Sequence, residues 1–205
     1  RHTYDNTLAT NLFDEVIVVT DHEIIYDEIT SNGGKAIMSK KTHESGSDRI
    51  AEAVEDKEVD IVLNVQGDEP FVSKNQLAKL LACFEEEDGS NVQVASLMKK
   101  FSDPVLAENP NLVKLVVDEN NNALYFSRSP IPFYRNKEVE RNYFEHIGVY
   151  AFRKQALLNF TSWPPTILEK SEMLEQLRYL EHGIKIRMVE VFETSLKIDV
   201  PEDLI

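Results

Sequence analysis

The chain has 205 residues, 42% of them hydrophobic and 28% charged, and a formal net charge of −14 at pH 7. This composition is typical of a folded protein with one large or two small α/β domains and argues against a disordered chain. The negative charge argues against nucleic acid or an anionic membrane as a partner, because phosphates would repel a chain without a basic stripe. An anionic substrate is therefore expected to arrive with a divalent cation.

No apolar run approaches the roughly 20 residues of a membrane helix, so no membrane partner is expected. The single cysteine, Cys83, has no second cysteine for an internal disulfide, and its helical context LAKLLACFEEE favours a small core residue over a nucleophile. A reducing cytoplasm fits this pattern, and no signal peptide is visible. The chain opens without methionine in RHTYDNTLATNLF, which looks like the middle of a helical segment. We therefore expect a further segment upstream of Arg1.

The first half of the chain alternates strand-like and helix-like segments. Continuous apolar runs predict strands, and amphipathic stretches behind capping residues such as Asp21 and Ser73 predict helices. The predicted strands cover 15–20, 35–39 and 60–67, and the predicted helices cover 22–34, 42–55 and 73–88. Alternation at this spacing is typical of parallel βαβ units and predicts a doubly wound, mostly parallel α/β sheet. Ligands of such sheets bind beyond the carboxyl ends of the strands.

The second half begins with several segments that are predicted to be strands. The segments predicted as strands are 92–100, 111–128 and 143–153, with a hairpin at the DENNN turn. They predict an antiparallel insertion at about 91–160. Two helical segments follow at 155–160 and 166–183, then a strand at 185–192 and a final helix that starts near Pro201. With no linker or repeat, residues 1–205 are predicted to form a single domain.

Acidic residues follow two of the predicted strands. Asp68 and Glu69 stand in the turn Gln-Gly-Asp-Glu-Pro, and Asp199 directly follows Ile198. Two aspartates at adjacent strand ends would form a Mg²⁺ site, since this ion takes few protein carboxylates together with substrate phosphates. Taken singly, each aspartate has another explanation, because Asp68 could stabilise its turn and Asp199 could cap a helix.

Five sequence strings occur in a fixed order: LNVQGDEPFV, ALYFSRSPIP, EHIGVYAFRKQAL, LEKSEMLEQLRYLEHG and IDVPEDL. With them the whole chain resembles the 3-deoxy-manno-octulosonate cytidylyltransferases. The resemblance implies a Rossmann-like, nucleotide-diphospho-sugar transferase fold, with the β-rich insertion used for sugar binding and dimerisation. It implies a cytoplasmic homodimer that serves lipopolysaccharide biosynthesis.

The implied reaction consumes CTP and 3-deoxy-D-manno-octulosonate. The anomeric hydroxyl of this acid sugar attacks the α-phosphorus of CTP, giving CMP-octulosonate and pyrophosphate. Catalysis of this kind depends on positioning and on neutralisation of charge.

The resemblance also assigns the site residues. It implies that Asp68 and Asp199 are catalytic and hold Mg²⁺, while Glu69 supports the turn. The implied pyrimidine pocket consists of Ser45, Gly46, Ser47 and Gln66. The residues implied to face the acid sugar are Arg128, His146, Tyr150, Glu175 and Gln176.

Simpler explanations exist for several of these residues. The Ser-Gly-Ser turn could be an ordinary helix N-cap, and His146 could be a structural histidine in a strand. Glu175 and Gln176 could belong to a solvated helix face. In a continuous helix these two side chains would point about 100° apart, so both reach one sugar only if a helix end faces the pocket.

Two features of the family pattern are missing from residues 1–205. One is a first strand with a basic, glycine-rich loop, R-x-x-S-x-R-x-P-G-K, which we expect upstream to bind the triphosphate. The other is a glycine that usually precedes the aliphatic residue before Asp199, where Lys197 stands here. The competing hypotheses are a related transferase for another acid sugar or nucleotide, and a non-catalytic α/β binding module.

Overall fold

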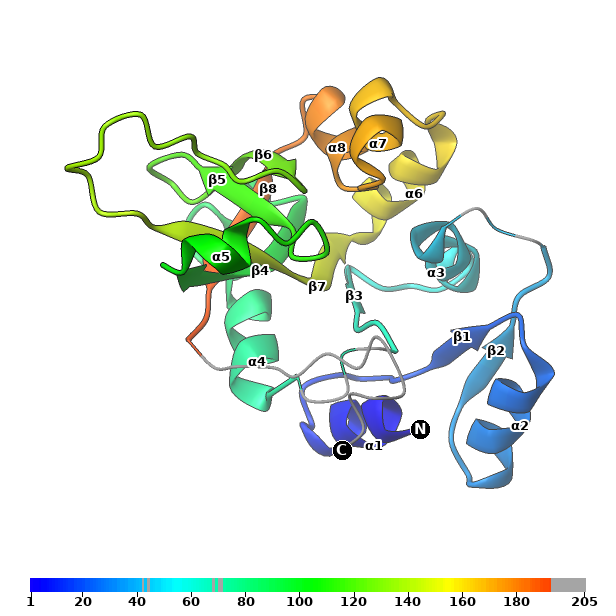
Figure 1. The fold of residues 1–205 in the computed structure, drawn as a ribbon. Coiled ribbons are helices and arrows are strands. Elements are labelled where there is room, and N and C mark those ends of the chain that lie inside the picture. The colour runs from blue at the N-terminus through cyan, green and yellow to red at the C-terminus, as the bar shows by residue number, and fades with distance from the viewer. Residues whose placement is uncertain (42, 44, 68, 70–71, 193–205) are drawn as a thin grey trace.

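The computed structural model describes residues 1–41, 43, 45–67, 69 and 72–192 (Figure 1). The predicted metal ligands Asp68 and Asp199, the final helix near Pro201 and the link between Lys197 and Ile198 lie outside the described residues.

Helices and strands follow the predicted order closely. The helices are α1 (His2–Ala9), α2 (Glu23–Ser31), α3 (Gly46–Val54), α4 (Lys74–Ala82), α5 (Pro104–Ala107), α6 (Lys154–Ser162), α7 (Ile167–Glu172) and α8 (Leu177–Glu181). The strands are β1 (Val18–Thr20), β2 (Ala36–Met38), β3 (Ile61–Asn64), β4 (Val94–Phe101), β5 (Lys114–Val117), β6 (Ala123–Ser127), β7 (Tyr143–Arg153) and β8 (Ile186–Glu190). The helical opening is confirmed as α1, while α5 and a short 3₁₀ helix at Gly89–Asn91 were not predicted.

The α/β class is confirmed; in the six-stranded sheet β3, β4, β5 and β8 run in one direction, and β6 and β7 run in the opposite direction between or beside them. Five strands lie in the order β6-β5-β7-β4-β8, and β3 joins this six-stranded sheet beside β7. Only the pair β4/β8 runs parallel among the described pairings of this sheet, whereas β3, β4 and β5 all run antiparallel to β7. β1 and β2 form a separate parallel pair. The alternating pattern could not reveal that β3 pairs with β7, a strand far along the chain.

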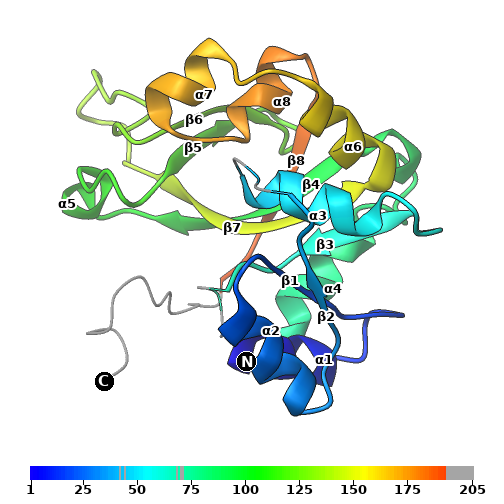
Figure 2. The same ribbon diagram turned by 90° about the vertical axis from the view of Figure 1, so that its right-hand side faces the viewer.

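Helices cover both faces of the six-stranded sheet, with α6, α7 and α8 on one side and α4 on the other (Figure 2). The long strand β7 serves both layers because successive side chains point to opposite faces. Tyr150 and Phe152 pack in the cluster under α6 and α8. Val149 and Ala151 pack in the cluster under α4. Cys83 is buried in this second cluster, as predicted, and burial raises the pKa of its thiol to about 11.

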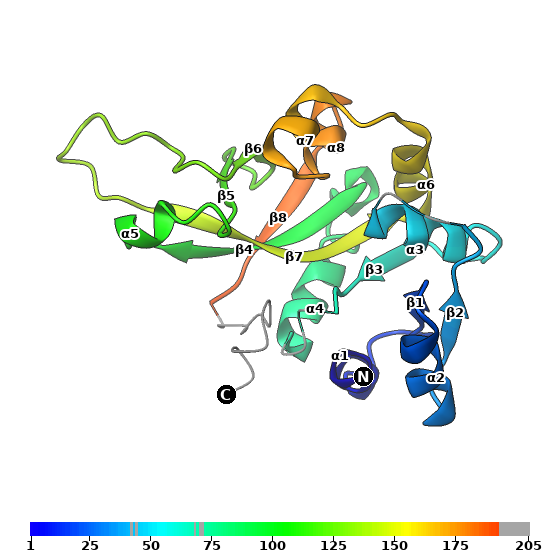
Figure 3. The same cartoon turned by 45° about the vertical axis from the view of Figure 1, so that its right-hand side comes forward.

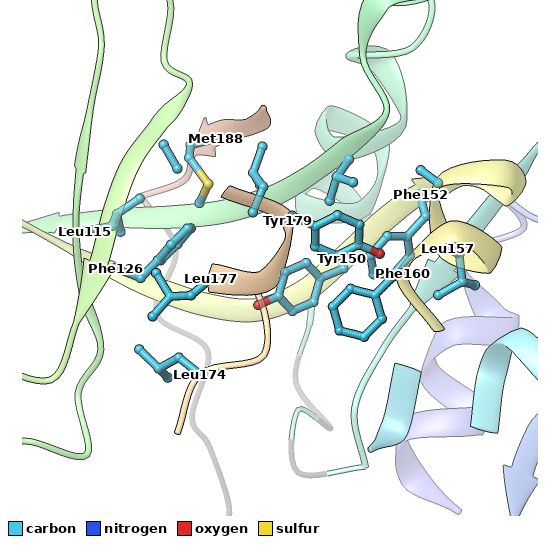
Figure 4. Packing of buried hydrophobic residues seen from close by; sticks show 14 of the residues in the cluster. Leu115, Phe126, Tyr150, Phe152, Leu157, Phe160, Leu174, Leu177, Tyr179 and Met188 are labelled. Carbon is cyan, nitrogen blue, oxygen red and sulfur yellow. The ribbon is translucent and has the colours of Figure 1, made fainter. Parts of the chain in front are cut away.

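Aromatic and aliphatic side chains fill the space between the sheet and helices α6 and α8 (Figure 4). Leu157, Phe160 and Leu177 are fully buried there. The rings of Phe160 and Tyr179 stack with centroids 4.7 Å apart. These contacts hold α8 against β7. Strand β7 also forms one wall of the candidate site.

The segment 166–183 was predicted to be one helix, but it forms two, α7 and α8. α7 ends at Glu172, and Met173 adopts the left-handed conformation with φ +53°. The guanidinium of Arg178 donates from Nε to Glu169 Oε2 at 2.7 Å and from Nη2 to Glu169 Oε1. Residues nine apart in a straight helix would be about 13.5 Å apart along its axis, so this ion pair requires the break.

Several local predictions are confirmed. The DENNN turn joins β5 to β6 in an antiparallel hairpin. Ser73 caps α4, and Gln76 completes a capping box with it. Asp21 does not cap α2, whose N-cap is His22. Its carboxylate instead accepts a hydrogen bond of 2.7 Å from Arg49 of α3. No helix in the described ranges is long and apolar enough to cross a membrane. The single-domain organisation of residues 1–205 stays a prediction.

We expect Ser73→Ala to lower the free energy of unfolding by about 1 kcal/mol, because the first turn of α4 loses its side-chain acceptor. Urea unfolding with an unchanged slope would measure this loss as a lower midpoint. Ser102→Ala, at an exposed serine outside a helix, is the matched control and should leave the midpoint in place. Equal midpoints for the two variants would refute the capping contribution.

Candidate active site

A cavity of about 440 Å³ lies beside β7, between the end of β3, the segment 109–113 and the break between α7 and α8. Its walls contain five residues that sequence analysis assigned to substrate binding: Gln66, His146, Tyr150, Glu175 and Gln176. These residues come from three separate parts of the chain. The structure thus brings most of the predicted substrate residues to one place, while their individual roles stay predictions.

The pairing of β3 with β7 explains why Gln66 reaches the cavity. Asn64 is the register partner of Tyr150, so the chain two residues further on lies opposite Gly148. A Cβ atom added to Gly148 would lie 3.6 Å from Gln66 Oε1. This is an ordinary van der Waals distance, so the Gln66 side chain lies against β7 at Gly148.

His146 and Tyr150 lie on the same face of β7, four residues apart, with ring centroids 5.3 Å from each other. Both are buried. Nε2 of His146 lies 2.9 Å from the hydroxyl oxygen of Ser96 on the neighbouring strand β4. Burial, followed by the nearby Glu175, raises the pKa of Tyr150 well above its ordinary value. Tyr150 therefore keeps its proton and offers the cavity a hydrogen-bond donor.

Glu175 and Gln176 stand in the break between α7 and α8, immediately before α8 begins at Leu177. The prediction of a continuous helix was wrong at this point, and the break lets both side chains line the same cavity. Burial raises the pKa of Glu175, and hydrogen bonds from Ser47 and Ser45 act in the opposite direction. Glu175 thus lies between the cavity and the N-terminus of α3.

Ser45, Gly46 and Ser47 form the first turn of α3. The Ser45 hydroxyl oxygen accepts a hydrogen bond of 3.2 Å from the Asp48 amide, so the predicted N-cap is present. Ser47 is buried, whereas a Cβ at Gly46 would meet open space. This turn is not among the walls of the cavity, but it lies next to it through Glu175.

The segment that leads from β2 to α3 is held by Glu52, a residue of α3. Its carboxylate accepts hydrogen bonds from Ser39 Oγ at 2.9 Å and from the Lys40 amide at 3.1 Å, and it lies 2.5 Å from Nε2 of His43. The contact with His43 is the largest of several that lower the pKa of Glu52 to about 2. The ionised carboxylate thus anchors the approach to the Ser45 turn.

Arg128 does not line the cavity but bridges the two segments that form its rims, residues 109–113 and the break between α7 and α8. Its guanidinium donates to three backbone carbonyls: Nε to Glu172 at 2.7 Å, Nη1 to Pro110 at 3.0 Å and Nη2 to Met173 at 3.3 Å. The Glu172 carboxylate in turn accepts from the Ser127 hydroxyl and the Arg128 amide. Arg128 therefore has a structural role that sequence analysis did not predict, beside the sugar-binding role that stays a prediction.

Lys114 is a buried cation that sequence analysis missed. It is fully buried in β5, and its ammonium donates to the carbonyls of Asn109 at 2.9 Å, Leu112 at 2.6 Å and Arg128. Burial is the main cause that lowers its pKa, followed by repulsion from Arg128. A lysine inside the apolar run KLVV was the available signal, because an ammonium is buried only where acceptors surround it.

Other polar residues of the cavity were also missed. Asn109, Asn111 and Glu145 contribute to its walls. Asn109 and Asn111 lie in an irregular segment, where polar residues are common for reasons unrelated to binding. Glu145 precedes His146 on β7, and its position in the sequence gave no separate signal.

Comparison with known proteins places this geometry in a family. Residues 1–186 match the cytidylyltransferase family. A 3-deoxy-manno-octulosonate cytidylyltransferase of Flavobacterium johnsoniae is 56% identical over 98% of this chain and 83% of its own length. One of Christiangramia forsetii is 54% identical over 98% of this chain and 82% of its own length. The chain belongs to the 3-deoxy-manno-octulosonate cytidylyltransferase family.

A solved structure of a CMP:2-keto-3-deoxy-manno-octonic acid synthetase, complexed with CTP, superposes with a TM-score of 0.92. It is 40% identical in sequence and covers 99% of this chain and 83% of that one. The predicted family, fold class and cytidylyltransferase activity are confirmed by these relatives. They do not favour a non-catalytic binding module.

The predicted Mg²⁺ ligands of this cytidylyltransferase, Asp68 and Asp199, lie outside the described residues. Across the described ranges, no group of three or more His, Cys, Asp or Glu side chains could hold a metal ion. Gln66, two residues before Asp68 in sequence, lines the cavity. Carboxylate oxygens are the donors that Mg²⁺ prefers, so the chemistry of the predicted pair fits this ion.

We expect Lys114→Met to lower the free energy of unfolding by about 2–4 kcal/mol, since three carbonyls at the rim lose their buried donor. Urea unfolding measures the change. Lys137→Met, at an exposed lysine, is the matched control and should have little effect. Wild-type stability in Lys114→Met would show that the buried ammonium does not hold the rim together.

The lowered pKa of Glu52 predicts how the stability of the fold changes with pH. This pKa is lowered from 4.5 to about 2 in the folded protein, so the residue's contribution to stability is complete above about pH 4.5 and is lost as the pH falls towards 2. The stability gap between wild type and Glu52→Gln should therefore be larger at pH 7 than at pH 3. Urea unfolding at both pH values tests this, with Glu58→Gln as an exposed control. A gap that does not narrow in acid would contradict the anchoring role of the carboxylate.

Proposed function

We propose that this protein transfers CMP from CTP to 3-deoxy-D-manno-octulosonate, releasing pyrophosphate, and that its product serves lipopolysaccharide biosynthesis. The observation that carries the proposal is the convergence of Gln66, His146, Tyr150, Glu175 and Gln176 on the cavity beside β7. The family relationship and the CTP bound to a structural relative support the identity of the substrates.

The cavity suits a polyhydroxylated acid sugar. Amide side chains of Asn109 and Gln176 offer donors and acceptors, and the carboxylates of Glu145 and Glu175 accept from hydroxyl groups. Such a mixed lining fixes the orientation of a sugar through directed hydrogen bonds. We assign the cavity to the octulosonate and the adjoining Ser45–Ser47 turn to the cytosine of CTP.

Arg128 is suited to the carboxylate of the acid sugar. A guanidinium has five N–H donors, and three of them are directed at the carbonyls of Glu172, Pro110 and Met173. Two N–H donors remain outside those three bonds, and a guanidinium donates strong, charge-assisted hydrogen bonds to a carboxylate. Met173 itself lines the cavity, so the guanidinium lies beside the proposed sugar site.

The reaction requires charge neutralisation, which the acidic chain does not supply by itself. Mg²⁺ held by Asp68 and Asp199 would offset the charge of the triphosphate and polarise its phosphoryl oxygens. The protein's own contribution is positioning: the cavity holds the sugar, and Gln66 places the β3 end beside it. We also propose that the enzyme is a homodimer and acts in the cytoplasm, where Cys83 stays reduced.

A pyrophosphate-release assay with CTP, octulosonate and Mg²⁺ tests the function. Omission of any one component should abolish release, and phosphorus NMR should detect CMP linked to the sugar. Replacement of CTP by UTP, or of octulosonate by another acid sugar, separates this activity from that of a related transferase. Faster turnover with an alternative substrate would overturn the assignment.

We expect Asp68→Asn to reduce turnover by about 100-fold or more, because the near-isosteric amide lacks the charge that holds the metal ion. The matched control is Asp60→Asn, an exposed aspartate that precedes the same strand β3 at its other end. The control should retain wild-type turnover and both variants the wild-type unfolding midpoint. Wild-type turnover in Asp68→Asn at saturating Mg²⁺ would refute the role of this carboxylate.

A further inference from the structure

Strand β7 contains a bulge directly beside the proposed sugar site. On β4, Leu97 pairs with Ile147, but the next residue back, Ser96, pairs with Tyr150. Gly148 and Val149 therefore have no register partner on β4. Figure 3 shows β4 and β7 side by side along their length. A bulge of this kind leaves backbone groups that the regular ladder does not satisfy.

The hydroxyl of Ser96, which is fully buried, is directed into this bulge. Its oxygen lies 2.9 Å from the carbonyl oxygen of Val149 and 3.3 Å from that of Ile147. Carbonyl oxygens only accept, so the hydroxyl proton is directed to them. If that proton pointed elsewhere, the lone pairs of Ser96 would face two carbonyl oxygens at close range.

The same hydroxyl oxygen lies 2.9 Å from Nε2 of His146. The Ser96 hydroxyl donates its proton to the carbonyl groups of the bulge. Its oxygen can therefore only accept a hydrogen bond from Nε2 of His146, so Nε2 must carry a hydrogen. A neutral imidazole carries one N–H, so His146 then has its proton on Nε2 and an acceptor at Nδ1. The ring is also held in place by the Phe126 ring, with centroids 5.1 Å apart.

We propose that Ser96 is a positioning residue for the acid sugar: by using its proton in the β7 bulge, it fixes the Nε2–H tautomer of His146, so that the imidazole accepts a hydrogen bond from a sugar hydroxyl. The inference rests on the proposed function for the identity of the sugar. The tautomer itself follows from the contacts of Ser96 and is independent of any substrate.

Nitrogen NMR on the substrate-free, wild-type protein tests the tautomer directly. The protein has five histidines, and His146→Gln identifies the resonances of His146 by their loss. At a pH where the ring is neutral, we expect Nε2 to resonate as a protonated nitrogen and Nδ1 as an unprotonated one. The opposite pattern overturns the proposal, and this measurement needs no variant of Ser96.

Steady-state kinetics test the consequence. Ser96→Ala should mix the two tautomers and raise the KM for octulosonate by about 5- to 10-fold, the effect of one hydrogen bond. The KM for CTP should change less than twofold. Ser96→Thr retains the hydroxyl and should restore both the tautomer and the KM. An unchanged sugar KM in Ser96→Ala, or an equal rise for both substrates, would assign Ser96 a purely structural role.

The two proposals fail in different ways. If the wild-type enzyme turns over CTP only with another sugar, the proposed substrate is wrong and octulosonate is replaced in the kinetic test by that sugar. If octulosonate is turned over but His146 has its proton on Nδ1, the proposed function stands and the role of Ser96 is overturned.

Discussion

The candidate site depends on a charge placed where charges are rarely found, the ammonium of Lys114 in the fully buried part of β5. Burial of an ion is costly unless hydrogen bonds replace its hydration shell. Here three backbone carbonyls do so, and they belong to the segment 109–112 and to Arg128. Arg128 continues the network to Glu172 and Met173 at the helix break. Lys114 and Arg128 thus join the two rims of the cavity through backbone carbonyls. The side chains that line the cavity stay available for a ligand.

Many helices, strands and turns were predictable because they depend on interactions between residues that are close in sequence. Ser73 signalled the start of α4, and the DENNN turn signalled the β5/β6 hairpin. What could not be predicted arises from contacts between distant residues. Met173 has no intrinsic preference for the left-handed conformation, so the helix break is set by packing and by the Glu169–Arg178 pair. The alternation of strands and helices likewise contains no information on the pairing of β3 with β7.

The site shows the same division. The strings that resemble the family identified Gln66, His146, Tyr150, Glu175 and Gln176, and the structure places all five around one cavity. Lys114 and Ser96 lie outside those strings, although a lysine within an apolar run was a signal for the first of them. Their importance comes from which carbonyl groups surround them, and neighbours of that kind are a property of the fold. The supporting residues of a site are therefore harder to predict than the residues that face its ligand.

The bulge in β7 also constrains how the length of this strand can change among relatives. Between Ile147 and Tyr150 the strand advances three residues while β4 advances one, a slip of two. An even slip preserves the alternation of faces, so Phe152 still points to the layer under α6 and Ala151 to the layer under α4. A single inserted or deleted residue here would exchange those two sets of side chains. Length variation at this position must therefore preserve the alternation of the two layers, which the present slip of two residues does.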